Sequence, residues 1–107
     1  MSDHSLIVSI VGKGWGSTVL EASVKAGARG GTVIYGRGAG INEQDKIFGM
    51  SIEPEKEILL TLTHADRVDD ILRAIVDAGE LNQTGRGIAF VVPVDKVLGV
   101  AHFMKQG

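Results

Sequence analysis

The sequence predicts a small α+β sandwich in which two strand–helix–strand halves share one antiparallel sheet. Three observations predict it: short apolar runs rich in β-branched residues, helical segments that alternate with them, and glycines gathered near their ends. The order strand–helix–strand–strand–helix–strand is that of the ferredoxin-like βαββαβ sandwich. The chain has 107 residues, 44% hydrophobic and 22% charged, so we expect a single domain over residues 1–107.

The first half of the chain contains two predicted strands and one predicted helix. The apolar run 5–11 predicts a buried strand. Thr18 and Glu21 have the spacing of a capping box, which predicts a helix that continues to about Ala26. The β-branched and aromatic residues 32–35 predict the second strand.

The second half repeats this order. Residues 57–63 predict a strand, and a helix follows from Asp66 to a stop at Gly79. One apolar stripe follows the helical period: Val68, Ile71, Leu72, Ile75 and Val76. Residues 88–92 predict the fourth strand, and residues 97–103 a short fifth one.

A long loop, residues 37–53, connects the two halves. Connections of this length are often functional. Its apolar part, 47–50, either folds back as a strand, which we favour, or presents Phe48 and Met50 to a partner. The candidate partner contacts in this loop are Gln44, Lys46, Phe48 and Met50.

The sheet is expected to have one apolar face without a helix over it. Two helices can cover only one face, yet runs such as 6–8 and 89–92 hardly alternate between apolar and polar residues. An exposed apolar sheet face is a liability in a monomer, so we expect this face to pack against other subunits.

Composition excludes several classes of protein. Eleven Lys and Arg against thirteen Asp and Glu give a formal charge of −2, which argues against a nucleic-acid partner. The absence of cysteine excludes a disulfide framework and a thiol nucleophile. No apolar run approaches the ~20 residues that cross a bilayer, and the N-terminus lacks a basic segment, so we expect a cytoplasmic protein without membrane insertion or signal peptide.

No constellation of residues indicates an enzyme or a metal site. The three histidines, His4, His64 and His102, show neither metal-ligand spacing nor a nucleophile partner. The carboxylates fall on a helix face or in a charged strand entry, where we expect them to be solvated: Asp69, Asp70, Asp77, Glu53, Glu55 and Glu57. We therefore expect no catalytic residues and no bound metal.

Two Gly-Arg-Gly turns, within 36–40 and 84–87, are the candidate ligand site. Glycine lets backbone N–H groups turn toward an anion, and arginine recognises phosphate with two parallel hydrogen bonds. Lys13 is a further possible phosphate contact, although a solvated loop lysine is the more common case. Pattern alone favours the simpler interpretation, tight turns with exposed arginines.

These residues resemble the nitrogen-regulatory P-II signalling family. The resemblance rests on Gly-Thr-Val at 31–33, the Gly-Arg-Gly turn before the long loop, and the segment 84–94. It implies a ferredoxin-like homotrimer that binds ATP or ADP in clefts between subunits, with no obligatory cofactor. It also implies that loop 37–53 is the equivalent of the T-loop, which regulates a partner such as an enzyme or a transporter.

The resemblance assigns roles to individual residues. It gives Thr32 an adenine contact and Lys56 a phosphate contact. The remaining phosphate contacts that it implies are Gly36, Arg37 and Gly38 at the base of the loop, and Gly85, Arg86 and Gly87 in a second turn. Arg86 stands where the family usually has aspartate, and Ile88 where it has lysine.

The alternative function is a structural or divalent-metal-binding trimer of the same fold, similar to the divalent-cation-tolerance proteins. It predicts metal binding through His64 or His102 and indifference to nucleotides.

Overall fold

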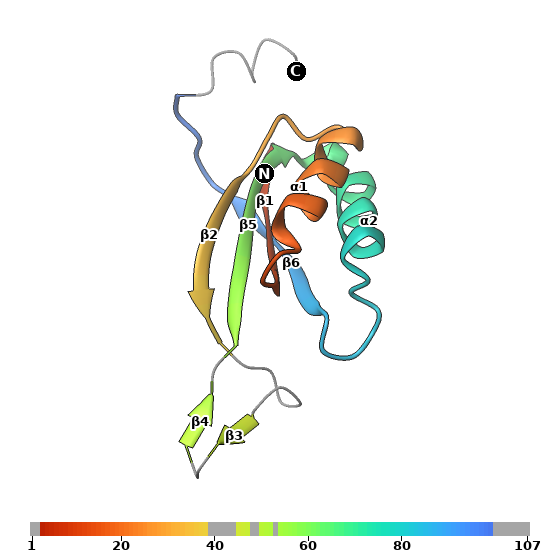
Figure 1. The fold of residues 1–107 in the computed structure, drawn as a ribbon. Helices are drawn as coiled ribbons and strands as arrows, with labels where there is room; N and C mark the ends of the chain where they lie inside the picture. Colours follow the sequence, from red (N-terminus) through yellow and green to blue (C-terminus); the bar gives the residue numbers. More distant parts are fainter. Residues whose placement is uncertain (1–2, 39–44, 48–49, 53, 100–107) are drawn as a thin grey trace.

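The protein is described by a computed structural model, which covers residues 3–38, 45–47, 50–52 and 54–99 (Figure 1). The strands and helices follow one another in this order: β1 (His4–Gly12), α1 (Gly16–Lys25), β2 (Thr32–Arg37), β3 (Asp45–Ile47), β4 (Met50–Ile52), β5 (Glu55–His64), the 3₁₀ turn η1 (Ala65–Arg67), α2 (Val68–Gly79) and β6 (Gly87–Val94).

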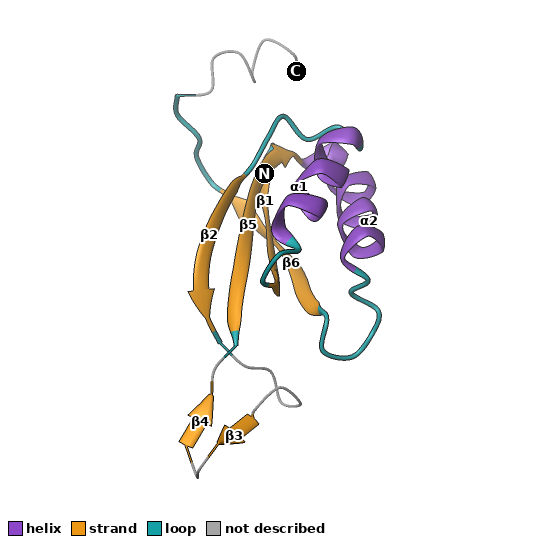
Figure 2. Cartoon of the chain, viewed as in Figure 1, coloured by secondary structure: helices purple, strands orange, loops and turns teal. Residues whose placement is uncertain are grey.

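Four strands form the main sheet in the order β2-β5-β1-β6, and every neighbouring pair is antiparallel. Val8 at the centre of β1 lies opposite Leu60 of β5 and Phe90 of β6. Figure 2 shows both helices on the same side of this sheet. The fold is therefore the ferredoxin-like α+β sandwich that the element order predicts.

The core lies between the helices and the sheet. β1 alternates strictly, with Ser5, Ile7, Ser9 and Val11 buried and the residues between them half-exposed. The fully buried apolar side chains of this layer come from both helices and from the two central strands: Ile7, Val11, Val19, Leu59, Ile71 and Ile75. Burial of each such side chain stabilises the fold by roughly 1.5–3 kcal/mol.

The other face of the sheet is apolar, and neither α1 nor α2, the helices of the described residues, covers it. Because side chains alternate along a strand, the residues opposite one another in register share this face. On three neighbouring strands the apolar residues of this face are Leu6, Val8 and Ile10 of β1, Ile58, Leu60 and Leu62 of β5, and Ile88, Phe90 and Val92 of β6. We call these nine residues the open face. Ile88 and Phe90 of this face are 56% and 43% exposed in the single chain.

Helix α1 does not begin with the predicted capping box. It starts at Gly16, and its N-cap residue, Trp15, makes no side-chain capping bond. Thr18 and Glu21 therefore lie inside the helix, and that prediction is wrong. The reason lies on another strand: a carboxylate of β5, described below, binds the free N–H groups at this helix end.

The end of helix α2 differs in one detail from the prediction. Gly79 is the last helical residue and is buried, and a side chain there would crowd Leu81 and Val19. The left-handed residue that ends the helix is Glu80, with φ of 55°. Beyond β6, residues 97–99 form no strand, and the rest of the predicted fifth strand lies outside the described residues.

Within loop 37–53, β3 and β4 pair as a small antiparallel sheet, with Ile47 opposite Met50. The favoured strand interpretation of this segment is thus confirmed. Figure 1 shows the pair beyond the ends of β2 and β5, apart from the main sheet. Lys46 lies in β3 and Met50 in β4, whereas Gln44 and Phe48 lie outside the described residues.

Candidate anion-binding site

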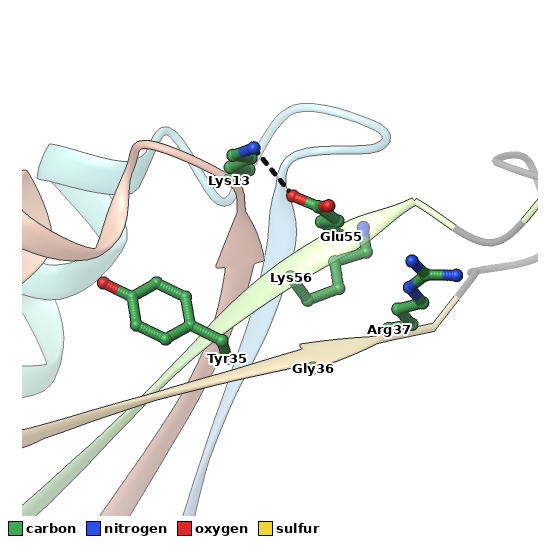
Figure 3. A pocket seen from close by; sticks show the side chains of 6 residues that line it. All are labelled: Lys13, Tyr35, Gly36, Arg37, Glu55 and Lys56. Carbon is green, nitrogen blue, oxygen red and sulfur yellow. Dashed lines mark ion pairs between the residues drawn. The ribbon is translucent and has the colours of Figure 1, made fainter.

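An open pocket of about 490 Å³ lies where loop 37–53 leaves the main sheet (Figure 3). Six of the described residues line it: Lys13, Tyr35, Gly36, Arg37, Glu55 and Lys56. They come from the end of β2, the start of β5 and the loop between β1 and α1.

Strand register brings these residues together. Gly36 pairs with Lys56, and Arg37 with Glu55, which is the last pair of the β2–β5 ladder. One step further, the Gly38 N–H donates a hydrogen bond of 3.2 Å to the Pro54 carbonyl. The pocket therefore sits directly at the foot of the long loop, where the two halves of the chain meet.

The pocket carries more positive than negative charge. Three of its lining residues are cationic and one is acidic, a local excess on a chain whose formal charge is −2. Lys56 is buried, with 7% of its surface exposed, whereas Arg37 is exposed. Such a cluster beside a glycine is suited to a ligand with several negative charges.

Lys13 and Glu55 form an ion pair across this pocket. The Nζ–Oε2 distance is 2.8 Å, and the two side chains are 71% and 52% exposed. The hydrogen bond and the charge of Lys13 hold the pKa of the Glu55 carboxyl below its ordinary value, and Arg37 contributes in the same direction. The same pair raises the pKa of Lys13. Both groups are charged at neutral pH.

The neighbouring acid on β5, Glu57, has a structural role. It is 8% exposed, and its carboxylate accepts hydrogen bonds from the backbone N–H groups of Gly14 at 2.9 Å and Gly16 at 2.8 Å. The expectation that Glu57 is solvated is therefore wrong. No local sequence signal indicates this contact, because the partners are more than forty positions apart in the chain.

Arg86 is held by contacts within the chain. Its guanidinium lies 4.0 Å from the centre of the Trp15 ring, and its Nη2 is 3.6 Å from Oε1 of Glu80. Gly85 and Gly87, with φ of 80° and 143°, turn the chain on either side of it. Arg86 thus ties the loop before β6 to the loop before α1.

The structure brings together part of the predicted site. Gly36, Arg37 and Lys56 line the pocket, and Gly38 borders it. Thr32 lies at the opposite end of β2, and the turn of Gly85, Arg86 and Gly87 does not line the pocket within one chain. The ligand contacts of all these residues stay predictions.

Sequence reasoning did not identify Tyr35 and Glu55 as lining residues. It gave Lys13 as a possible phosphate contact but favoured a solvated loop lysine. Their position depends on strand register. Gly12, which precedes Lys13, lies opposite Lys56, and Tyr35 lies opposite Glu57. Pairing the two central strands by their apolar pattern is the signal that could have placed Lys13 next to Glu55.

His4 and His64 lie opposite each other on β1 and β5, and their ring centres are 4.7 Å apart. The part of the chain that the structure describes contains no group of three or more His, Cys, Asp or Glu arranged to hold a metal ion. His102 lies outside that part.

Among the residues that the structure describes, no helix has the length and apolar character needed to cross a membrane.

Comparison with known proteins identifies the family. No curated protein sequence matches the chain. Among solved structures, a crystal structure of Arabidopsis thaliana PII bound to citrate is similar, with 25% identity and a TM-score of 0.72. The match covers 96% of this chain and 85% of the Arabidopsis chain. The family model of the nitrogen regulatory protein P-II matches residues 4–102, so this chain belongs to the P-II family.

Proposed function

We propose that this protein is a trimeric P-II regulator that binds an adenine nucleotide or a related polyanion between subunits. Binding would change loop 37–53 and thereby the activity of a partner protein in the cytoplasm, such as an enzyme or a transporter. The observation that carries this proposal is the cationic pocket at the foot of the loop, lined by Lys13, Arg37 and Lys56.

The chemistry of the pocket supports a phosphate-bearing or carboxylate-bearing ligand. Arg37 offers a planar group that can bind two anionic oxygens at once, and Lys56 adds a second charge from a mostly buried position. The related Arabidopsis structure contains citrate, a small polyanion, which agrees with an anionic ligand here. None of the lining residues forms an acid–base or nucleophile pair suited to catalysis, so the proposed role is regulation.

The open face supports assembly into a trimer. Nine apolar residues on three neighbouring strands lie on a sheet face that neither helix of the described residues covers, and their burial between subunits would stabilise an oligomer. The family resemblance implies a ligand site between subunits, to which one subunit contributes the pocket and another the 85–87 turn. This arrangement would explain why the turn and the pocket are separate within one chain.

The position of the pocket supplies a mechanism for switching. Arg37 and Glu55 form the last pair of the main sheet before the loop, so a ligand held there contacts the residues from which the loop departs. A ligand that binds one loop arrangement more tightly shifts the population toward it by its difference in affinity. Loop 37–53 would then present Lys46 and Met50, together with Gln44 and Phe48, to the partner.

Isothermal titration calorimetry with ATP, ADP and AMP tests the proposal. We expect binding by the wild type and a loss of about tenfold in affinity for Arg37→Ala, because a bidentate charged contact is removed. Arg73→Ala, which removes an exposed arginine from helix α2, is the matched control and should bind normally. Absence of heat with every adenine nucleotide would overturn the nucleotide proposal.

A metal-binding trimer is the second candidate, and the side-by-side rings of His4 and His64 are the observation that favours it. Two imidazoles on neighbouring strands could share one zinc ion, although a complete site needs further ligands. Titration of the apoprotein with Zn²⁺ alone, compared with His64→Ala, would distinguish this function from nucleotide binding.

A further inference from the structure

We propose that Glu55 is a competing counter-ion built into the anion site, which an incoming anionic group must displace from Lys13. The inference rests on the proposed function, because it assigns a role to one residue of the same pocket. Glu55 then influences both affinity and specificity. Its carboxylate lowers the affinity of every anionic ligand, and it favours those ligands that carry enough charge to replace it at Lys13.

The Glu55 carboxylate lies directly beside one of the cations of the pocket. Of the six described residues that line the pocket, Glu55 is the only acidic one, and its Oε2 atom lies 2.8 Å from Nζ of Lys13. Arg37 is its partner in the strand register and lies close enough to lower the pKa of Glu55. Figure 3 shows Lys13 and Glu55 facing each other at the pocket. A ligand anion at Lys13 would need the place that this carboxylate takes.

Breaking the Lys13–Glu55 ion pair costs little free energy. Both side chains are more than half exposed, and exposed ion pairs contribute little to folding stability. The adjacent acid, Glu57, fixes the loop through two hydrogen bonds to its backbone, so the fold does not depend on Glu55 to place Lys13. Glu55 can therefore leave Lys13 without unfolding the loop.

Glu55 competes with ligands for Lys13 as a tethered carboxylate, at an effective concentration of about millimolar or higher. An anion that contacts Lys13 alone gains little in place of this carboxylate, whereas a polyphosphate gains from Lys13, Arg37 and Lys56 together. After displacement, Glu55 stays beside the ligand and repels it, so a ligand needs contacts with Arg37 and Lys56 in addition to Lys13 to bind with a net gain. Specificity is then set as much by the repulsive group as by the attractive ones.

Calorimetric titration with sodium tripolyphosphate, in buffer with EDTA to remove divalent cations, tests the proposal. We expect Glu55→Gln to bind tripolyphosphate about fivefold more tightly than the wild type, because the competitor is lost while the side-chain size is kept. Glu21→Gln is the matched control. It removes the same charge from an exposed ion pair with Lys25 in helix α1. Neither residue of that pair lines the pocket, so the affinity should be unchanged.

A double-mutant cycle separates direct competition at Lys13 from a general loss of negative charge. In the Lys13→Gln background, the gain from Glu55→Gln should fall to less than about twofold, because the carboxylate no longer competes for that lysine. An equal gain in both backgrounds would overturn the assignment of Lys13 as the shared partner. Adenosine, which carries no phosphate, should bind the wild type and Glu55→Gln equally.

The failures of the two proposals are distinguishable. Unchanged or weaker binding of tripolyphosphate by Glu55→Gln, with clear binding by the wild type, would overturn the counter-ion role and leave the anion site intact. Absence of binding by the wild type and by every variant would overturn both. Thermal unfolding of each variant would show that the exposed substitutions leave the fold unchanged.

Discussion

The carboxylate of Glu57 accepts a hydrogen bond of 2.8 Å from the backbone N–H of Gly16, the first residue of helix α1. A second bond, to Gly14, fixes the loop before the helix. Helix ends have unsatisfied N–H groups and favour negative charge, so Glu57 replaces the local capping residue that this helix lacks. Because Lys13 belongs to the same loop, Glu57 also places one of the cations of the pocket.

Replacing Glu57 should destabilise the protein strongly. Glu57→Ala leaves two backbone N–H groups without their charged acceptor, at a cost on the order of 3 kcal/mol. For a domain of this size, the melting temperature should fall by roughly 10–20 °C. Glu21→Ala, which removes an exposed acid from helix α1, should change the melting temperature little. Equal effects of the two substitutions would contradict the capping role.

Gly87→Ala should also destabilise the fold. Gly87 has φ of 143°, and a Cβ atom there would collide with the backbone carbonyl of Ile10 on the neighbouring strand. We expect a loss of about 2–4 kcal/mol in the free energy of unfolding, measured by urea denaturation. Gly38→Ala is the control, since nothing lies within 4 Å of its position, and it should change stability by less than about 0.5 kcal/mol.

Arg86→Ala should be visible in tryptophan fluorescence. Trp15 is the only tryptophan of the chain, and the Arg86 guanidinium lies 4.0 Å from the centre of its ring. Removing the guanidinium exposes the indole to water and should shift its emission to longer wavelength, with a stability loss of about 1 kcal/mol. Arg73→Ala should leave the spectrum unchanged. An unshifted spectrum in Arg86→Ala would show that the stacking is absent in solution.

A charge in the open face should prevent assembly. Val8 lies at the centre of this face, between Leu60 and Phe90. Val8→Lys should turn the expected trimer into smaller or aggregated species, because an unpaired charge would be buried at the subunit contact. Light scattering coupled to size-exclusion chromatography measures the mass. Asp77→Lys, on the exposed side of helix α2, is the control and should stay trimeric.

The Lys13–Glu55 ion pair should form only while both side chains are charged, so its formation depends on pH at both ends of the range. The pKa of Glu55 lies below its ordinary value of 4.5, so the pair is complete above that pH and is lost as pH falls through the lowered pKa. The pKa of Lys13 is raised above 10.5, so the pair is lost at the other end as pH rises through it. In a carboxyl-detected NMR titration, the midpoint of Glu55 should move up toward 4.5 in Lys13→Gln. An unmoved midpoint would show that the pair does not form in solution.

Much of the fold could be predicted because its signals are local. The stripe from Val68 to Val76 predicts α2 from helical spacing alone, and the β-branched runs predict the strands of the main sheet. The family resemblance also rests on local motifs, such as the segment 84–94, and the comparison with the P-II family confirms it. The predicted capping box at Thr18 does not form. Its pattern is short, and Glu57, which is distant in the sequence, binds the N–H groups at the start of helix α1.

The order of the elements, the apolar faces and the Gly-Arg-Gly turn beside the long loop follow from the amino-acid sequence alone. The charges that meet at this loop are brought together by the tertiary structure. Antiparallel pairing places Lys13 beside Glu55, and it turns Glu55 toward the pocket while Glu57 is buried under the loop. The physical reason is that strand register depends on the packing of the whole sheet, which no local pattern of charged residues specifies.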